Sequence, residues 1–277
     1  MIISKVIGGL GNQMFQYAIA HSIALENSVD FKLDISEFET YELFSYRLNE
    51  FNISGDISSE QDIKAVVGKN TFLRGILKRL GLGNHFIERE RTIYDSSVFK
   101  KGNLYLEGYW QNELYFSKYR KSILKAFTPK CSFSGQTIRY GEKIKSTKSV
   151  SVHIRRGDYL KHDEIGVLPL SYYQKAIIFL QSKEPNSIFY FFSNDIAWCK
   201  ESFKDIDNTV FIDDTESEIA DLWLMSQCES NIIANSSFSW WGAWLNQNPN
   251  KVIISPTRWM IDNPKNHKWV PDEWLQF

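Results

Sequence analysis

V-S-V-H-I-R-R-G-D-Y, residues 150–159, is the segment that decides the fold. Its alternating first half predicts a strand at residues 150–154, with valine and isoleucine on one face and His153 and Arg155 on the other. Gly157 permits a sharp turn after this strand. Because arginine pairs bidentately with phosphate, the segment suits an anion site. The same pattern also describes a surface strand end whose arginines pair with nearby acids.

The residues after this segment alternate apolar strands with helical segments at a regular spacing. This order implies right-handed crossovers and a parallel sheet with both faces covered, so the predicted fold class is α/β. The expected strands are 150–154, 188–192, 210–212, 232–234 and 252–254, and the expected helices are 171–183, 195–203, 216–228 and 237–246.

Ligands of such sheets bind beyond the carboxyl ends of the strands, and polar residues follow every expected strand. Asn235 to Ser237 open a helix, so hydroxyls and backbone N–H groups meet at a positive helix end that suits phosphate. With Arg155 opposite, they would clamp a diphosphate. The alternative is plain N-capping by Ser236 or Ser237. The tryptophans of this helix are expected in the core. The strand-end residues are Arg155-Arg156-Gly157-Asp158, Ser193-Asn194-Asp195, Asp213-Asp214, Asn235-Ser236-Ser237 and 255–258.

The N-terminal region begins with a strand at 2–7, a glycine-rich loop at 8–13 and an apolar helix at 14–25 that must be buried. A second strand ending at Asp34 completes an imitation of the dinucleotide-binding fingerprint. Met14 stands where that fingerprint needs its third glycine, which argues against NAD. Gly9, Asn12 and Gln13 can still offer backbone N–H groups and side-chain amides to a ligand.

The length of 277 residues favours two domains. Residues 129–148 are polar and predict a linker between domains at 1–128 and 149–277. A net charge of −1 argues against a nucleic-acid partner. The three scattered cysteines predict neither a disulfide framework nor a zinc cluster.

No apolar run approaches the length of a membrane span and no signal segment is evident, so a cytoplasmic protein is expected. A basic amphipathic stripe at 72–80 predicts packing against the domain, with contact to a membrane surface as the alternative.

Five motifs, in this order along the chain, resemble the α-1,2-fucosyltransferase family: Gly8-Gly9-Leu10-Gly11-Asn12-Gln13-Met14-Phe15-Gln16-Tyr17-Ala18, Gly108-Tyr109-Trp110-Gln111, His153-Ile154-Arg155-Arg156-Gly157-Asp158-Tyr159, Phe192-Ser193-Asn194-Asp195 and Asn235-Ser236-Ser237-Phe238-Ser239-Trp240-Trp241. The resemblance implies an inverting glycosyltransferase that uses GDP-fucose, needs no metal or other cofactor, and has the GT-B arrangement of two Rossmann-like domains facing a cleft. It implies that the C-terminal domain binds the donor, with Arg155 on the diphosphate and His153 near the nucleoside.

The resemblance and the strand-end positions together predict two sets of binding residues. The donor-binding set is Gly9, Asn12, Gln13, His153, Arg155, Ser193, Asn194, Asp195, Asn235, Ser236, Ser237 and Phe238. The aromatic, amide-rich loop after the strand at 104–106 is expected to bind the acceptor through Tyr109, Trp110 and Gln111.

In the expected reaction, a general base deprotonates an acceptor hydroxyl, which attacks the anomeric carbon of fucose from the face opposite GDP. Arg155 stabilises the leaving diphosphate. Candidate bases are Asp158, His162, Asp163 and Glu164, with Asp163 or Glu164 preferred because Asp158 is expected to hold the turn. Adjacent acids at 213–214 lack a full ligand set for Mg²⁺ or Mn²⁺.

The expected partners are GDP-fucose and a galactose-terminated oligosaccharide or lipid-linked glycan, modified at the 2-hydroxyl of galactose to give an α-1,2 linkage. Membrane contact is at most peripheral, at the inner face and through residues 72–87. Two alternatives stay open: a GT-B transferase for another nucleotide sugar, and a non-catalytic carbohydrate-binding protein that uses its Trp-rich C-terminal end as a stacking surface.

Overall fold

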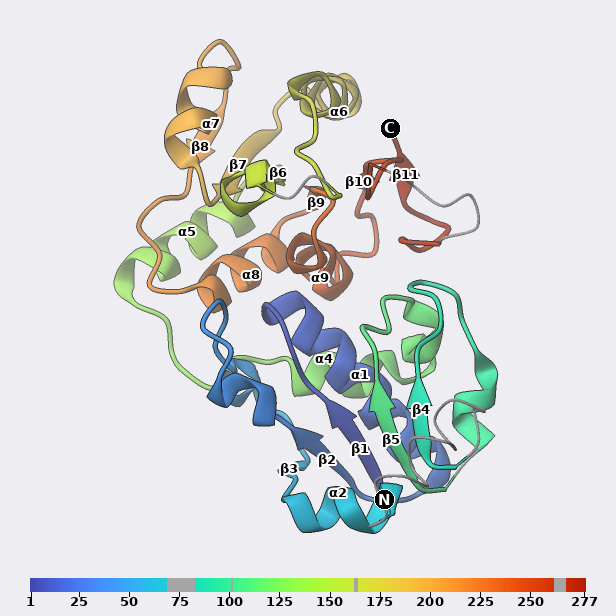
Figure 1. Ribbon diagram of the computed structural model, residues 1–277. Helices are drawn as coiled ribbons and strands as arrows, with labels where there is room; N and C mark the ends of the chain where they lie inside the picture. The colour runs from blue at the N-terminus through green and yellow to red at the C-terminus, as the bar shows by residue number, and fades with distance from the viewer. Residues whose placement is uncertain (69–82, 101, 162–163, 262–267) are drawn as a thin grey trace. The chain divides into compact units, whose positions relative to one another are not determined.

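The computed structural model describes residues 1–68, 83–100, 102–161, 164–261 and 268–277. The chain divides into two compact units. Unit 1 is Met1–Lys130 with residues 268–269, and unit 2 is the described part of 131–261 with 270–277. Each unit has a parallel sheet with helices packed on it (Figure 1), so the predicted α/β class is confirmed.

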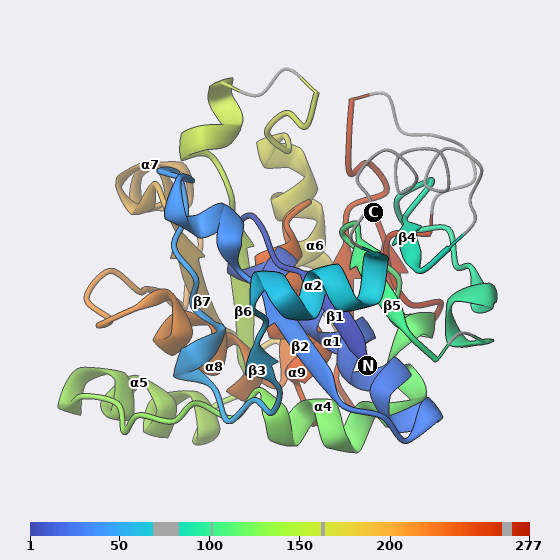
Figure 2. The same cartoon turned by 60° about the horizontal axis from the view of Figure 1, so that its bottom comes forward.

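Unit 1 has a five-stranded sheet in the order β3-β2-β1-β5-β4, with every pair parallel. Helix α1 packs against β1 and β2 and helix α2 against β5, and Figure 2 shows α2 crossing the strands. The strands are β1 (Ile2–Lys5), β2 (Phe31–Asp34), β3 (Asp56–Ile57), β4 (His85–Ile87) and β5 (Leu104–Glu107). The helices are α1 (Leu10–Asn27), α2 (Glu60–Val67) and α4 (Arg120–Ala126), with short 3-10 turns η1 (Ser36–Glu39), η2 (Leu48–Glu50), η3 (Ser96–Lys100), η4 (Glu113–Tyr115) and η5 (Ser117–Tyr119).

Helix α1 is buried from Leu10 to Ala24 except at Asn12, as its nearly continuous apolar sequence predicted. It begins directly after Gly9 and ends at Ser28, which adopts a left-handed conformation with φ of 52°. The backbone N–H of Ser28 donates to the last turn and satisfies carbonyls that the helix leaves open. The helix therefore holds the glycine-rich loop at the carboxyl end of β1.

Unit 2 has a six-stranded parallel sheet in the order β11-β10-β9-β6-β7-β8. All strands and helices expected in this half are present, with small shifts at their ends, while α5 and β11 were not expected. The strands are β6 (Ser149–Ile154), β7 (Ile188–Ser193), β8 (Thr209–Phe211), β9 (Ser230–Ile232), β10 (Ile253–Ser255) and β11 (Leu275–Gln276). The helices are α5 (Gly135–Lys145), α6 (Leu170–Lys183), α7 (Ile196–Ser202), α8 (Glu218–Gln227) and α9 (Ser237–Leu245), with the 3-10 turn η6 (Gly157–Lys161).

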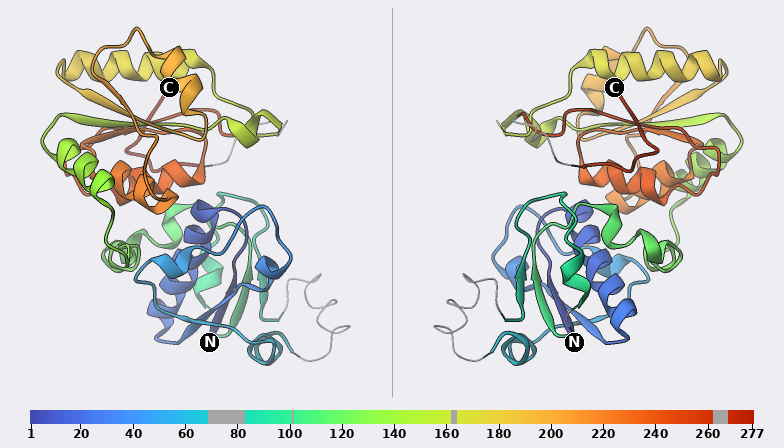
Figure 3. Two further views of the ribbon diagram at one scale, coloured as in Figure 1. Left: turned by 90° about the vertical axis from the view of Figure 1, so that its left-hand side faces the viewer. Right: turned by 90° about the vertical axis from the view of Figure 1, so that its right-hand side faces the viewer.

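Strand β6 is buried on both faces along its whole length. Val150 and Val152 belong to the core cluster that includes residues of α6 and α7. On the opposite face, Asn231 donates to Ser151 Oγ (2.7 Å) and to the carbonyl of Met225 in α8 (2.8 Å). Figure 3 shows α6 and α7 on one side of the sheet and α5, α8 and α9 on the other. The alternative of a surface strand is therefore wrong for the strand itself.

The tryptophans of α9 are core residues, as expected. Trp240, Trp241 and Trp244 are nearly inaccessible to solvent, and the Trp241 ring lies 5.1 Å from Trp240 and 5.2 Å from Trp244. Trp274 packs on the same cluster, 5.4 Å from Trp240. These rings fill the interior beneath α9, so this cluster offers no surface for stacking a sugar.

Most of the range predicted as a linker, 129–148, is folded. Helix α5 occupies its centre and packs on α8, and the ring of Phe133 lies 4.8 Å from that of Trp223. The sequence of this range is polar because α5 buries only a narrow stripe. No described helix is long and apolar enough to cross a membrane. The amphipathic stripe at 72–80 lies outside the described residues.

Candidate active site

The candidate site of unit 2 lies where the order of strands reverses. The chain runs from β6 to β7 and β8 on one side, and then returns to β9 on the other side of β6. Loops leaving β6 and β9 therefore diverge, and open α/β sheets bind ligands in the crevice that this creates. Arg155 follows β6, and Asn235 to Ser237 follow β9. Because all six strands are parallel, their carboxyl ends share one edge of the sheet, as predicted.

The Arg155 guanidinium contacts Asp158 and Tyr159 in the turn that follows it. Its Nη2 donates to Asp158 Oδ2 at 2.8 Å, and its Cζ lies 5.5 Å from the centre of the Tyr159 ring. Its Nε is buried and has no hydrogen-bond partner among the described residues. The side chain is 24% exposed. Asp158 thus orients the guanidinium while part of its donor fork stays available to an anion.

Arg156 points to a different set of partners. Its Nε lies 3.2 Å from Asp195 Oδ2, and its guanidinium stacks 4.0 Å from the centre of a Trp198 ring. Asp195 also accepts from the backbone N–H of Trp198 and so caps α7. The backbone N–H of Arg156 donates to Asn194 Oδ1 at 3.0 Å. Both arginines therefore pair with acids, and Asp195, which was predicted to bind the donor, caps α7 and holds Arg156 in this structure.

The turn after β6 depends on Gly157. A Cβ on this residue would lie 2.4 Å from Asn194 Nδ2, which is closer than side-chain carbons approach nitrogen. Asn194 uses this space to bond the turn, and its Nδ2 also donates to Asp158 Oδ1. Ser193 Oγ accepts from the backbone N–H of Asp195 at 3.0 Å. Ser193 and Asn194, also predicted as donor ligands, shape the loop in this structure.

His153 is neutral and buried. Its ring is 4% exposed, its Nδ1 has no hydrogen-bond partner among the described residues, and it lies 5.5 Å from the ring of Phe238. Burial, with a further contribution from the charge of Arg155, lowers the pKa of His153 to about 3. At neutral pH the imidazole is therefore uncharged and is a poor general base.

Asn235 joins two loops at the carboxyl end of β9. Its Nδ2 donates to the carbonyls of Gly166 (3.1 Å), Trp259 (3.2 Å) and Ile165 (3.4 Å). The side chain is 4% exposed, and its Oδ1 is buried without a partner among the described residues. Asn235, which was predicted to bind the donor, thus uses its amide nitrogen to hold the protein's own loops.

The start of α9 has the electrostatic character expected for phosphate binding. Ser236 is the N-cap residue, yet its side chain makes no capping hydrogen bond, so the alternative of plain N-capping by Ser236 is wrong. Ser236 is instead a partner of the Tyr159 hydroxyl, which also donates to the carbonyl of Asn235 at 3.3 Å. Burial raises the pKa of Tyr159. The helix therefore begins with a positive end that its own serine does not cap.

Two of the four candidate bases, Asp158 and Glu164, are among the described residues. Asp158 accepts from both Arg155 and Asn194 and so belongs to the turn. Glu164 is exposed, and its backbone carbonyl accepts from the N–H of Ile261 at 2.8 Å. Residues 162–163, which include His162 and Asp163, lie outside the described residues.

The adjacent acids Asp213 and Asp214 are engaged separately. Lys200 pairs with Asp213 at 2.5 Å, and Tyr140 donates to Asp214 at 2.8 Å. Within the described part of the chain, no group of three or more His, Cys, Asp or Glu side chains could hold a metal ion. These two carboxylates therefore serve the protein's own contacts.

Two loops meet at the carboxyl ends of β1 and β5 in unit 1. Asn12 Oδ1 accepts from Gln111 Nε2 at 2.8 Å, and Gln16 Nε2 donates to the carbonyl of Gly108 at 3.0 Å. Gln13 is fully buried, and its amide bonds Gly8, Ser45 and Arg47. Gln13, which was predicted to bind the donor, uses its side-chain amide to hold the backbone of the protein's own loops in this structure.

Asp34 does not serve as the ribose ligand of a dinucleotide site. Its Oδ2 accepts from the Tyr105 hydroxyl at 2.6 Å and its Oδ1 from the backbone N–H of Ser36 at 3.1 Å, and the side chain is buried. Met14 fills the core where a third glycine would allow close packing. Both observations agree with the argument against NAD.

Trp110, which was predicted to bind the acceptor, is a buried residue just after the end of β5. It is 0% exposed and adopts a left-handed conformation with φ of 57°. Glu88, which the sequence reasoning missed, accepts from the backbone N–H groups of Tyr109 (2.6 Å) and Trp110 (3.0 Å). Gly108 makes room for this contact, because a Cβ there would lie 2.4 Å from Glu88 Cβ.

Two parallel α/β units with polar loops at their strand ends define a GT-B-like fold. A structure of Arabidopsis thaliana FUT1 in complex with GDP has the same fold, with a TM-score of 0.51 at 10% identity over 91% of this chain and 69% of that one. The chain belongs to glycosyl transferase family 11, whose model matches residues 1–275, and is a glycosyltransferase of the α-1,2-fucosyltransferase family.

Two relatives frame the specificity within this family. An alpha-1,2-colitosyltransferase of Escherichia coli is 35% identical over 289 residues, covering 100% of this chain and 98% of the relative. Galactoside alpha-(1,2)-fucosyltransferase 2 of Bos taurus is 24% identical over 258 residues, covering 87% of this chain and 67% of the relative. The names of both specify a 1,2 linkage, and they differ in the sugar transferred.

Proposed function

We propose that this enzyme transfers L-fucose from GDP-β-L-fucose to the 2-hydroxyl of a terminal galactose in a glycan, with inversion to an α-1,2 linkage. The observation that carries the proposal is that Arg155 and the start of α9 follow the neighbouring strands β6 and β9, at the same edge of the sheet. A guanidinium and a helix N-terminus both stabilise the charge that grows on a departing diphosphate. The bovine relative supports fucose as the sugar and a galactoside as the acceptor.

In this mechanism Arg155 binds the diphosphate through the part of its fork that Asp158 does not use. His153, neutral and buried, offers a hydrogen bond to the nucleoside without placing a second charge beside Arg155. Each preorganised donor of this kind typically lowers the barrier by about 3 to 4 kcal/mol. The carboxylates at 163–164 are the proposed base, since Asp158 is engaged in the turn.

The enzyme is further proposed to be metal-independent and cytoplasmic. Asp213 and Asp214 face Lys200 and Tyr140, so the described residues offer a diphosphate no carboxylate-bound cation. Cys131, Cys199 and Cys228 are free thiols, which agrees with a reducing compartment. Activity that disappears on chelation and returns with Mn²⁺ would contradict metal independence.

A second candidate donor is GDP-colitose, because the E. coli relative transfers colitose. Colitose is L-fucose without its 3-hydroxyl, so the diphosphate contacts would be unchanged. A site built to bond that hydroxyl discriminates strongly against the deoxy sugar, whereas an apolar contact there would favour colitose.

The test is transfer from GDP-fucose, GDP-colitose and a UDP-sugar to a galactose-terminated oligosaccharide, followed by determination of the linkage. We expect the highest kcat/KM with GDP-fucose and a product substituted at the 2-hydroxyl. Faster transfer of colitose would identify GDP-colitose as the donor and leave the proposed mechanism unchanged. Thermal stabilisation by UDP and not by GDP would overturn the proposal, because only ligands of the native state raise the melting temperature.

A further inference from the structure

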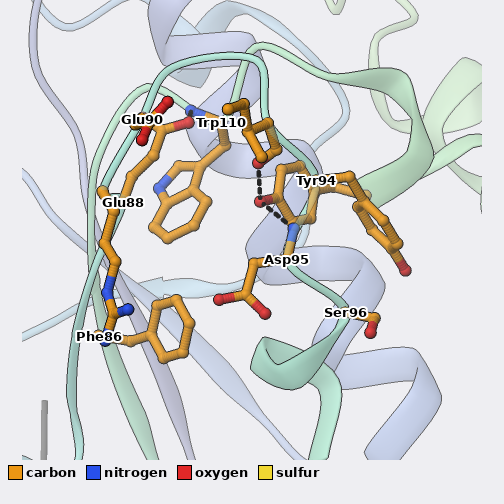
Figure 4. A pocket seen from close by; sticks show the side chains of 10 residues that line it. Phe86, Glu88, Glu90, Tyr94, Asp95, Ser96 and Trp110 are labelled. Carbon is orange, nitrogen blue, oxygen red and sulfur yellow. Dashed lines mark hydrogen bonds between the residues drawn. The ribbon is translucent and has the colours of Figure 1, made fainter. Parts of the chain in front are cut away.

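A cavity of about 340 Å³ opens in unit 1 beside the carboxyl end of β4. Figure 4 shows its aromatic walls, which include Phe86, Tyr94 and Trp110. Tyr115 completes these walls, and its hydroxyl bonds the backbone of Ile93 and Asp95. We call this space the Trp110 cavity. Its volume lies in the range of about 300 to 1,000 Å³ that is typical of small-molecule sites.

Among the described residues, the charged groups that line the Trp110 cavity are mostly acidic. Glu88, Glu90 and Asp95 line it, together with one described cation, Arg89. In Figure 4 the carboxylate of Asp95 points toward the space between the rings of Phe86 and Trp110. Carboxylates accept hydrogen bonds from hydroxyl groups and repel anions. The cavity therefore suits a neutral ligand rich in hydroxyls.

The indole of Trp110 supplies a second and independent sign of a ligand. Its ring lines the cavity and is fully buried, and its Nε1 has no hydrogen-bond partner among the described residues. Buried polar groups are normally bonded, so an N–H on a cavity-lining ring calls for an acceptor that the described residues do not provide. A ligand hydroxyl oxygen would provide it.

A second cavity, of about 450 Å³, shares the side chains of Tyr94, Ser96 and Tyr115 with the first. We call it the Tyr119 cavity. It is lined further by Phe99, Leu114 and Tyr119 and by the ion pair of Glu26 with Lys118. Tyr94 is 37% exposed and its ring lies 5.0 Å from that of Tyr115. An exposed aromatic ring thus stands at the boundary of two adjoining cavities.

We propose that the Trp110 cavity and the Tyr119 cavity bind consecutive sugar rings of a neutral oligosaccharide acceptor, with Tyr94 as the shared platform. Pyranose rings present C–H faces that pack on the electron-rich faces of aromatic rings, and hydroxyl edges that bond carboxylates. The acidic excess of the first cavity repels acceptors that carry a carboxylate or phosphate, so it also selects by charge. The ligand is an acceptor only if the proposed transfer function holds.

The position of the Trp110 cavity connects it to the reaction. Trp110 is followed by Gln111, which bonds Asn12 in the glycine-rich loop at the carboxyl end of β1. The cavity therefore lies at the same edge of the sheet as that loop. The Tyr119 cavity includes Glu26, near the far end of α1, so it extends away from this edge. A longer glycan would enter it with its distal part.

The experiment compares Tyr94→Ala and Asp95→Asn with the wild-type enzyme. Two readouts are used: KM for a neutral galactose-terminated tetrasaccharide, and its binding without donor by saturation-transfer NMR. Asp95→Asn keeps an oxygen to accept from the N–H of Ser97 (2.9 Å). Tyr94→Phe, which keeps the ring, and Ile57→Ala, exposed by 47% and outside both cavities, are the matched controls.

We expect Tyr94→Ala to raise the acceptor KM about tenfold and weaken binding by the same factor, with the donor KM unchanged. Asp95→Asn should improve transfer to an acceptor bearing a uronic acid relative to its neutral counterpart. Leu114 lines the Tyr119 cavity and not the Trp110 cavity, so Leu114→Ala should weaken binding of the tetrasaccharide and leave binding of a disaccharide unchanged.

Unchanged oligosaccharide binding in both Tyr94→Ala and Asp95→Asn would overturn the proposed site. Equal affinity of the wild type for neutral and acidic glycans would also contradict it. The NMR readout needs no donor, so oligosaccharide binding that depends on Tyr94 without any transfer would refute the enzyme function and leave the site standing. Transfer from GDP-fucose with normal kinetics in the variants would support the enzyme function and refute the site.

Discussion

Replacement of Asn235 by Leu should loosen the loops at the carboxyl end of β9 while leaving the volume of the side chain nearly unchanged. The amide Nδ2 donates to the carbonyls of Gly166, Trp259 and Ile165 at 3.1 to 3.4 Å. Leu supplies no donor, so these carbonyls lose a shared partner in a site that is 4% exposed. The change therefore tests whether Asn235 positions loops.

The expected loss of stability follows from the number and quality of these bonds. A typical hydrogen bond contributes about 1 kcal/mol net, and a buried group left without a partner costs about 1 to 3 kcal/mol. One donor nitrogen shared by three acceptors is worth less than three separate bonds, and the bond to Ile165 is long. We therefore expect the free energy of unfolding of unit 2 to fall by about 2 to 3 kcal/mol.

Thermal unfolding measures this loss, and about 2 to 4 °C of Tm per kcal/mol is typical for a domain of this size. The expected decrease is thus about 4 to 12 °C. Asn186→Leu is the control because Asn186 is exposed, and it should change the free energy by less than about 0.5 kcal/mol. GDP should still stabilise the variant, whereas kcat should fall because the loop that carries Glu164 is no longer held.

Two results would refute this reasoning. An unchanged Tm would mean that the carbonyls find other donors and that Asn235 holds nothing. A normal Tm with lost GDP binding would instead make Asn235 a direct ligand of the donor through its buried Oδ1.

Three further predictions concern unit 2. Arg155→Ala should lower kcat about 10² to 10³-fold with little change in Tm, and Arg155→Lys should restore only part of the lost kcat. Normal turnover in Arg155→Ala would show that Arg155 has no role in the mechanism. Gly157→Ala should lower Tm, by about 1 to 3 kcal/mol in free energy, because its Cβ would lie 2.4 Å from Asn194 Nδ2; an unchanged melting curve would contradict this. Burial raises the pKa of Asp221 to about 6, so the free energy of unfolding of the wild type should fall from pH 4 to pH 6 and stay low above pH 6. Asp221→Asn, which can still accept from Thr215, should raise the free energy of unfolding, measured in urea, by on the order of 2 kcal/mol at pH 8 and leave it unchanged at pH 4. An equal increase at both pH values would exclude ionisation of Asp221 as the cause.

The order of strands and helices was largely predictable from the sequence. The alternation of Val150, Val152 and Ile154, repeated in the later strands, reflects a side-chain period of two that any pleated strand imposes. The continuous apolar run of α1 likewise required burial. Helix α5 was missed because its sequence is polar around a narrow buried stripe, and local pattern does not separate such a helix from a linker.

The roles of individual polar residues were much less predictable. Gln13, Asn194 and Asp195 were predicted to bind the donor, and in the structure their side chains bond the protein's own loops. The sequence shows which polar side chains follow a strand. It does not show which groups they bond, because many of these partners lie far away along the chain. Glu88 illustrates the same limit, since it meets Tyr109 only because β4 and β5 are neighbours.

The segment 150–159 by itself determined a buried strand followed by arginines and a tight turn, because periodicity and glycine act over a few residues. Tertiary structure decided what the two arginines do. Arg156 is stacked and paired within the loop, whereas Arg155 keeps a buried Nε without a partner among the described residues. The difference arises from residues near 158 and 195, which the sheet brings together. The sequence alone does not reveal these contacts, because hydrogen bonding depends on distance in space and not along the chain.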